Sequence, residues 1–124
     1  SMVAPDLELK TSFDVDKVLL PSEQATGIAL TLNELLQNAI EHGFENRKKG
    51  TLQVSFKVVG SKGMLEIKDD GAGLSPGFDL KNTESLGLKI VQTMVESFGG
   101  KFELLPLEQG TCARVLVPIM RGNV

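Results

Sequence analysis

The stretch NELLQNAIEH, residues 33–42, decides how this sequence folds and what it can hold. On a helix with 100° between residues, Glu34, Asn38 and His42 form one line along its length. An Asn oxygen is a hard, neutral donor that suits Mg²⁺, a Glu carboxylate can accept or position a proton, and a His can donate a hydrogen bond to phosphate. A solvated helix edge without a role is the alternative interpretation of this stretch alone.

The helix that carries this line is predicted to begin after Pro21, with Ser22 as its N-cap, and to run to about His42, where Gly43 ends it. The line borders a broad apolar arc, which we expect to press on a sheet. This arc consists of Ile28, Ala29, Leu32, Leu35, Leu36, Ala39 and Ile40. The side that should face water holds Asn33, Gln37 and Glu41.

The segment DDGAGL, residues 69–74, is a glycine-bearing turn directly after a predicted strand. Asp69 at the end of that strand can accept a hydrogen bond from the exocyclic amine of adenine. Gly71 and Gly73 would let the backbone come close to the ligand. A simple turn built from Asp and Gly is the alternative interpretation.

A second glycine turn, SLGLKIV at residues 85–91, opens a predicted helix over 85–98. Gly87 in its first turn would let phosphate approach free backbone N–H groups and the positive end of the helix dipole. A well-packed core helix with an incidental glycine is the alternative. Neither the Walker phosphate loop nor the G-x-G-x-x-G fingerprint occurs in the chain. The apolar face expected for this helix holds Leu86, Leu88, Ile90, Val91, Met94, Val95 and Phe98.

The remaining elements are short strands of alternating polarity. We predict strands at 7–13, 51–59, 64–68, 101–105 and 111–119, a turn at 60–63, a charged loop at 45–50 and one long irregular stretch at 71–84. Strands beside two helices indicate an α/β (α+β) sandwich of two layers. Its sheet should be mixed, mostly antiparallel and covered on one face by helices.

Bulk composition limits the function classes. The 124 residues, 41% apolar and 23% charged, are expected to form one globular domain over 1–124, and the net charge of −3 argues against a nucleic-acid footprint. No apolar run is long enough for a membrane span, so we expect no direct membrane contact and a cytoplasmic location. Cys112, in a strand-like run, is expected to be a buried, inert thiol. The first two residues, Ser1 and Met2, are interpreted as a cloning remnant.

Taken together and in this order, the segments resemble the ATP-binding GHKL, or Bergerat, fold of gyrase B, MutL, the large heat-shock chaperone and the histidine kinases. NELLQNAIEH resembles the N box, DDGAG the G1 box and SLGLKIV the G2 box, with Ser85 where many relatives have glycine. Gly110 and Thr111 resemble the strand that supports the adenine pocket. The match covers about residues 22–119. It is most similar to the catalytic domain of the short-lid sensor histidine kinases related to the HWE group.

The resemblance implies ATP and Mg²⁺ as cofactors and assigns roles to individual positions. Asn38 would bind Mg²⁺ and Glu34 would act as the base or orient the accepting imidazole, while Thr111 would back up Asp69. Gly87 and Leu88 would offer backbone N–H groups to phosphate, and Lys81 is a hypothetical phosphate contact. The full implied ATP set is Asn38, His42, Asp69, Gly71, Gly73, Leu74, Lys81, Ser85, Leu86, Gly87, Leu88 and Thr111.

The function implied is a kinase module that passes the γ-phosphoryl group of Mg-ATP to a histidine. The one histidine here, His42, belongs to the nucleotide site, so the acceptor is expected on a separate dimerisation domain of the same protein, with a response regulator downstream. The domain could be the cytoplasmic part of a membrane-bound sensor. An anti-sigma-factor serine kinase of the same fold, a GHKL ATPase in which Glu34 activates water, and a degenerate nucleotide sensor are the alternatives.

Overall fold

A computed structural model describes residues 6–120 of the chain, so the interpretation of Ser1 and Met2 lies outside the described residues. The helices and strands within this range follow the predicted order, with two short helical turns in addition. They are β1 (Glu8–Val15), α1 (Ser22–Asn38), the π-helical turn η1 (Ala39–Gly43), β2 (Lys49–Val59), β3 (Lys62–Asp69), the 3₁₀ turn η2 (Leu80–Asn82), α2 (Leu86–Ser97), β4 (Lys101–Pro106) and β5 (Thr111–Pro118).

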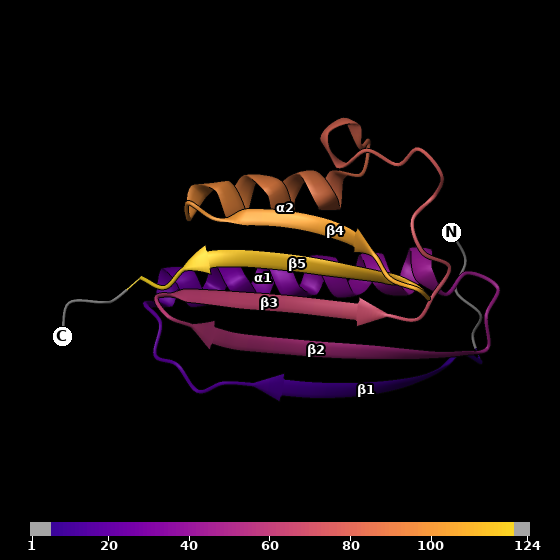
Figure 1. Ribbon diagram of the computed structural model, residues 1–124, viewed down its shortest axis with the longest axis horizontal. Helices are drawn as coiled ribbons and strands as arrows, with labels where there is room; N and C mark the ends of the chain where they lie inside the picture. The colour runs from indigo at the N-terminus through magenta and orange to yellow at the C-terminus, as the bar shows by residue number, and fades with distance from the viewer. Residues whose placement is uncertain (1–5, 121–124) are drawn as a thin grey trace.

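The strands form one sheet in the order β1-β2-β3-β5-β4. β1 runs parallel to β2, and every other neighbouring pair is antiparallel. Both long helices lie on the same side of the sheet, with α1 running behind β3 and β5 and α2 packed against α1 and β4 (Figure 1). The prediction of a mixed, mostly antiparallel sheet covered on one face is therefore confirmed.

The hydrophobic core lies between this sheet and the two helices. Alternate residues of the three central strands face it, because directly opposed residues such as Val54, Ile67 and Ala113 share one face of a sheet. Each fully buried aliphatic or aromatic side chain stabilises the fold by about 1.5–3 kcal/mol. The most deeply buried members of the core are Leu35, Phe44, Leu52, Ile67, Val91, Val95, Val115 and Val117.

The opposite face of the sheet is polar, and Cys112 lies within it. Only 1% of Cys112 is exposed, and Glu66 beside it accepts a hydrogen bond from Arg114 Nε at 2.7 Å. Burial, together with the negative charge of Glu66, raises the pKa of the Cys112 thiol to about 11. The thiol therefore stays protonated at neutral pH, as expected for a buried cysteine.

The buried stripe of α1 is rotated from the predicted apolar arc. Ala29, expected against the sheet, is exposed. The reason is that α1 packs on α2 as well: the ring of Phe98 fills the space beside Gly27, and Thr31 Oγ1 donates to Met94 Sδ at 3.5 Å. The predicted arc assumes that the helix contacts only the sheet, so it does not include the contact with α2. The buried residues of α1 are Gln24, Gly27, Thr31 and Leu35.

Both ends of the first helix differ from the prediction. Ser22 is the first helical residue and not the N-cap: Pro21 occupies the cap position, and its carbonyl accepts from Ala25 N at 2.9 Å. No side chain caps this end. At the other end the α-helix stops at Asn38, and the expected last turn is a π-helical turn, Ala39–Gly43.

Strand pairing also shifts the ends of several strands from their predicted positions. β1 extends two residues beyond the predicted strand 7–13, and β2 begins at Lys49, inside the predicted loop 45–50, because Glu8 pairs with Lys49. The turn predicted at 60–63 narrows to two residues between β2 and β3. The irregular stretch 71–84 contains the 3₁₀ turn η2.

The apolar face predicted for the second helix is too broad. Leu86 is 72% exposed and Ile90 is 39% exposed, so neither belongs to the core. Contact with α1 and β4 buries one stripe only, which holds Leu88, Val91 and Val95. Within residues 6–120, no helix has both the length and the apolar character that crossing a bilayer requires.

Candidate functional site

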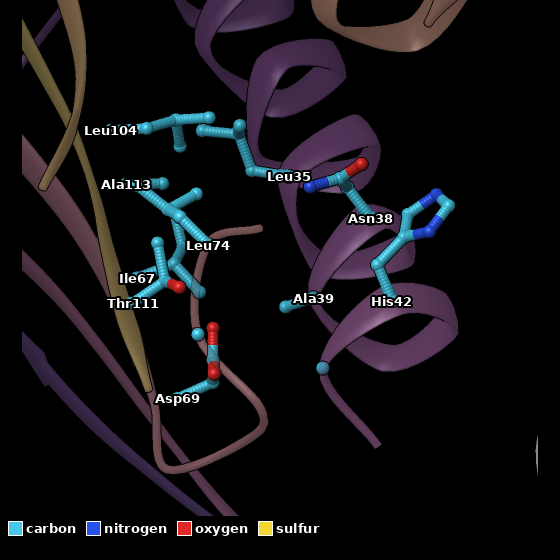
Figure 2. A pocket seen from close by; sticks show the side chains of 12 residues that line it. Leu35, Asn38, Ala39, His42, Ile67, Asp69, Leu74, Leu104, Thr111 and Ala113 are labelled. Carbon is cyan, nitrogen blue, oxygen red and sulfur yellow. The ribbon is translucent and has the colours of Figure 1, made fainter. Parts of the chain in front are cut away.

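A cavity between α1 and the sheet brings four parts of the chain together. Its volume is about 60 Å³, below the roughly 300–1,000 Å³ of ligand pockets, and the side chain of Leu74 lies between sheet and helix (Figure 2). Polar groups meet an otherwise apolar lining, as in small-molecule sites. The lining residues are Leu35, Asn38, Ala39, His42, Gly43, Ile67, Asp69, Gly73, Leu74, Leu104, Thr111 and Ala113.

Asp69 is the buried carboxylate of this cavity. It closes β3 opposite Thr111 of β5 and is 7% exposed. Burial raises the pKa of Asp69, while hydrogen bonds from the backbone N–H groups of Gly71 and Thr111 act in the opposite direction. The Gly71 N–H donates to Asp69 Oδ1 at 2.9 Å. An acceptor held in this way can bind the amine of a flat heterocycle that enters the cavity.

The π-helical turn joins α1 to the loop that carries Asp69. Ala72 N donates to Gly43 O at 2.9 Å, and a Cβ at Gly43 would lie 3.3 Å from Asp69 Oδ1. A Cβ at Gly71 would collide with the carbonyl of Gly43, so this close approach of two backbones requires glycine at position 71. Single π-helical turns are frequent at functional sites, and this one sets the end of α1 against the carboxylate.

The neighbouring carboxylate, Asp70, has a different environment. It is exposed and accepts hydrogen bonds from the Thr51 hydroxyl and from Thr51 N, the latter at 2.8 Å. These two bonds lower the pKa of Asp70, whereas burial raises that of Asp69. Asp70 therefore fastens the loop to β2, and Asp69 alone faces the cavity.

Asn38 and His42 line the cavity from the helical side. Figure 2 shows both side chains farther from the sheet than Leu35 and Ala39. Asn38 is half-buried and His42 is exposed, so polar donors stand where the cavity meets solvent. Asn33, Gln37 and Glu41, which were predicted to face water, are exposed.

Glu34 meets the second glycine turn outside this cavity. A Cβ at Gly87 would lie 2.8 Å from Glu34 Oε2. Ser85 is the N-cap of α2, and its Oγ accepts from Leu88 N at 3.3 Å. Leu86 points into solvent and Leu88 into the core. Most of the predicted nucleotide-site residues thus lie in two places, one group along the cavity and one at the start of α2.

Lys81 lies apart from both groups. It is exposed on η2 and lines a separate cavity of about 460 Å³ against α2 and β4. Gln92 Nε2 donates to Leu80 O at 3.2 Å, and the Asp79 side chain accepts from Lys81 N at 3.0 Å. The first of these bonds holds η2 on α2 and the second caps η2, so the structure does not bring Lys81 together with Asp69 or Asn38.

Six lining residues were not among the predicted site residues. Ile67 lies two residues before Asp69, and Ala113 two residues after Thr111, so the period of two in a strand could have identified both. Leu35 and Ala39 belong to the apolar arc predicted for the first helix, so helical periodicity indicates their burial but not their place in the site. Gly43 and Leu104 depend on the π-helical turn and on strand pairing, which no local pattern reveals.

A metal cage made of side chains alone is not found in the part of the chain that the structure describes. Residues 6–120 contain no group of three His, Cys, Asp or Glu placed to hold an ion. Mg²⁺ in nucleotide sites typically uses one or two protein ligands, completed by phosphates and water. The oxygen of Asn38 at the edge of the cavity fits that donor set.

Two named histidine kinases resemble this chain in sequence. The blue-light-activated histidine kinase 2 of Erythrobacter litoralis is 30% identical over 112 residues, which cover 90% of this chain and 32% of that protein. The sensor histidine kinase PdtaS of Mycobacterium tuberculosis is 35% identical over 109 residues, 86% of this chain and 22% of that protein. The chain thus spans about a third or less of these relatives.

A solved structure and a family model also match this chain. The solved histidine kinase domain of a blue-light activated histidine kinase from Erythrobacter litoralis superposes with a TM-score of 0.82 at 29% identity, covering 90% of this chain and 52% of that one. A family model matches residues 23–121, which include the cavity and the start of α2. ATP is the nucleotide that this family implies. The chain belongs to the family of histidine kinase-, DNA gyrase B- and HSP90-like ATPases.

Proposed function

We propose that this chain is the Mg-ATP-binding catalytic domain of a two-component sensor histidine kinase. It donates the γ-phosphoryl group of ATP to a histidine on a separate dimerisation domain of the same protein. The observation that carries the proposal is one cavity with a buried Asp69 at its sheet side and Asn38 and His42 at its helical side. The named sensor histidine kinases among its relatives support the same reaction.

The base of ATP enters beside Asp69 in this proposal. The carboxylate accepts from the exocyclic amine of adenine, and a base with a carbonyl at that position leaves the buried acceptor unpaired, which costs about 1–3 kcal/mol. Thr111 supports Asp69 from the paired strand. Gly71 and Gly73 keep the loop free of side chains where the ring enters, and Leu74 moves aside to enlarge the cavity.

The phosphates extend along α1 toward Glu34. His42 donates to phosphate, and Asn38 holds Mg²⁺, which supplies charge neutralisation on the phosphates when bound. The N–H groups of Gly87 and Leu88, at the positive end of the α2 dipole, face the phosphoryl group that is transferred. The proximity of Gly87 to Glu34 supports this path.

The transfer step uses Glu34 as the base or as the group that orients the acceptor. A nitrogen of the acceptor imidazole bonds to the γ-phosphorus, the bond from phosphorus to the β–γ bridging oxygen breaks, and ADP leaves. Glu34 takes the proton that the imidazole ring loses. Because the acceptor has to be brought in line with the phosphate, the chain alone binds ATP and turns over very little of it.

The partners follow from this chemistry. A dimerisation domain supplies the accepting histidine, and a response regulator receives the phosphoryl group from it. We place the domain in the cytoplasm, where ATP is available. Its net charge of −3 gives no reason to expect a nucleic-acid partner.

The test is autophosphorylation of the full-length protein with γ-labelled ATP. Glu34→Gln should lower transfer about 100-fold or more while the affinity for ATP stays unchanged, because the substitution removes proton acceptance and little volume. Glu41→Gln is the matched control, since it makes the same change at an exposed position of the same helical segment and should transfer normally.

The stability of the labelled product separates the proposal from its alternatives. A phosphohistidine is labile to acid and stable to alkali, as the proposal requires. An acid-stable label on a partner protein would instead indicate a serine kinase, and inorganic phosphate released without a labelled protein would indicate a plain ATPase. Full transfer by Glu34→Gln would remove Glu34 from the mechanism.

A further inference from the structure

A side chain outside the cavity holds the loop that carries Asp69. Gln109 lies in the turn between β4 and β5, and its Nε2 donates to Gly71 O at 2.7 Å and to Asp70 O at 3.3 Å. The N–H of the same Gly71 donates to Asp69 Oδ1 at 2.9 Å. A single residue, Gly71, therefore connects the Gln109 amide to the buried carboxylate.

The turn that carries Gln109 is packed tightly on this loop. Gly110 has a φ of +89°, and a Cβ there would collide with the carbonyl of Asp69. Leu107 N donates to Gly110 O at 3.1 Å and closes the turn, while Thr111 pairs with Asp69 directly afterwards. Gln109 thus sits at a fixed place relative to the loop, and its amide can hold one arrangement of the loop backbone.

Other contacts hold the loop from two other sides. Ala72 N binds Gly43 O on the helical side, and Asp70 binds Thr51 on the side of β2. Gln109 holds the side that faces the β4–β5 turn. It is exposed and does not line the cavity, so it acts on the ligand only through the loop.

We propose that Gln109 is a positioning residue, which holds the Asp70–Gly71 backbone so that Asp69 points at the exocyclic amine of the base and thereby sets the preference for adenine. This inference rests on the proposed function, namely that the cavity binds ATP. The chemistry needs a donor at position 109, because both groups that it contacts are backbone carbonyl oxygens. A carboxylate of the same shape would repel them.

The experiment is calorimetric titration of the 124-residue chain with ATP and with inosine triphosphate, whose base has a carbonyl in place of the amine. Gln109→Ala should weaken ATP binding about fivefold, which is the size of one lost hydrogen bond. The affinity for inosine triphosphate should change less, so the preference for ATP over inosine triphosphate should decrease. A merely structural role would weaken both nucleotides equally.

Three further variants sharpen the test. Gln109→Lys keeps a donor of similar reach and should recover part of the affinity and selectivity. Gln109→Glu keeps the shape without a donor and should bind ATP at least as weakly as Gln109→Ala. Glu108→Ala alters the exposed neighbour in the same turn and should match the unmodified chain.

The outcomes separate this inference from the proposed function. An unchanged ratio of ATP to inosine triphosphate affinity in Gln109→Ala overturns the positioning role, and so does equal behaviour of the Lys and Glu variants. If the unmodified chain binds no ATP, the proposed function fails and this inference fails with it. Thermal unfolding of each variant shows that the compared proteins are folded.

Discussion

The two ends of the candidate nucleotide site are built differently. At the base end, Asp69 is buried, bonded to backbone N–H groups and enclosed by Gly43 and Gly71. At the phosphate end, Leu86 is exposed at the start of α2, and Lys81 lies on a different cavity. At the base end the acceptor carboxylate is already held in place and only Leu74 has to move, whereas the phosphate end consists of surface groups.

This difference assigns different tasks to the two ends. A rigid acceptor within a packed sheet can discriminate between bases, because a mismatch leaves a buried group unpaired. Exposed groups at a helix start contribute mainly through charge and backbone dipoles, which salt and water weaken. We therefore expect substitutions at the base end to have large effects on stability and nucleotide affinity, and those at the phosphate end to have small effects on both.

The largest expected effect is on stability at the base end. Gly110→Ala should lower the free energy of unfolding by about 3 kcal/mol or more, because the new methyl group meets the Asp69 carbonyl at a φ of +89°. Gly77→Ala is the matched control in the irregular stretch: its φ is +75°, and a Cβ there would have open space around it. It should cost about 1 kcal/mol. Urea unfolding followed by circular dichroism measures both. Equal losses would mean that the base end is no more tightly built than the stretch beside it.

The sequence predicts the position of Asp69 in the fold well. Asp69 follows an alternating strand and precedes glycines, which is enough to place a carboxylate at a strand end, and the sheet architecture follows from the same alternation. Leu35 and Ala39 were correctly expected in the buried face of the helix. These results depend on residues close together in the chain.

The features that the sequence misses depend on contacts between distant segments. The rotation of α1 comes from the ring of Phe98 beside Gly27, and the π-helical turn comes with contacts between Gly43 and the loop at Ala72. Helical periodicity alone does not show which part of an apolar face is covered by neighbouring elements. For this reason it predicts Leu86 on the buried face of α2, although Leu86 is exposed. Lys81 is the one basic residue of the irregular stretch 71–84, and neither its charge nor its place in the chain specifies where it lies in the fold.

The pH dependence of base binding should be the next largest effect. Because burial raises the pKa of Asp69, acidification should weaken adenosine binding at a higher pH than an ordinary aspartate would allow. Adenosine carries no phosphates, so its titration reports on the base end alone. A binding curve that stays flat down to the usual pKa of aspartate would contradict the buried, ligand-facing role.

Ionisation of Asp69, which favours binding of the base, disfavours folding. A raised folded-state pKa means that the native chain holds the proton more tightly than the unfolded chain. The contribution of Asp69 to stability therefore falls as pH rises through its folded pKa, and at neutral pH its ionised form destabilises the fold. Asp69→Asn should accordingly be at least as stable as the unmodified chain at neutral pH.

The smallest effect should come from Lys81. Lys81→Ala should weaken ATP binding by about twofold or less at low salt, and not measurably at physiological salt, because an exposed lysine away from the cavity contributes little. Calorimetry at two ionic strengths measures this. Unchanged affinity at low salt would end its assignment as a phosphate contact, whereas a tenfold loss would mean that the phosphate end is more ordered than we describe.

The most direct test of the account is the affinity of the 124-residue chain for ATP before and after Asp69→Asn. The substitution keeps the size of the side chain but replaces the buried carboxylate, so binding should weaken tenfold or more. Asp70→Asn makes the same change one residue later, where the side chain is exposed and bonded to Thr51, and it should bind within about twofold of the unmodified chain. Equal affinity in the unmodified chain and in folded Asp69→Asn would contradict the claim that Asp69 recognises the base.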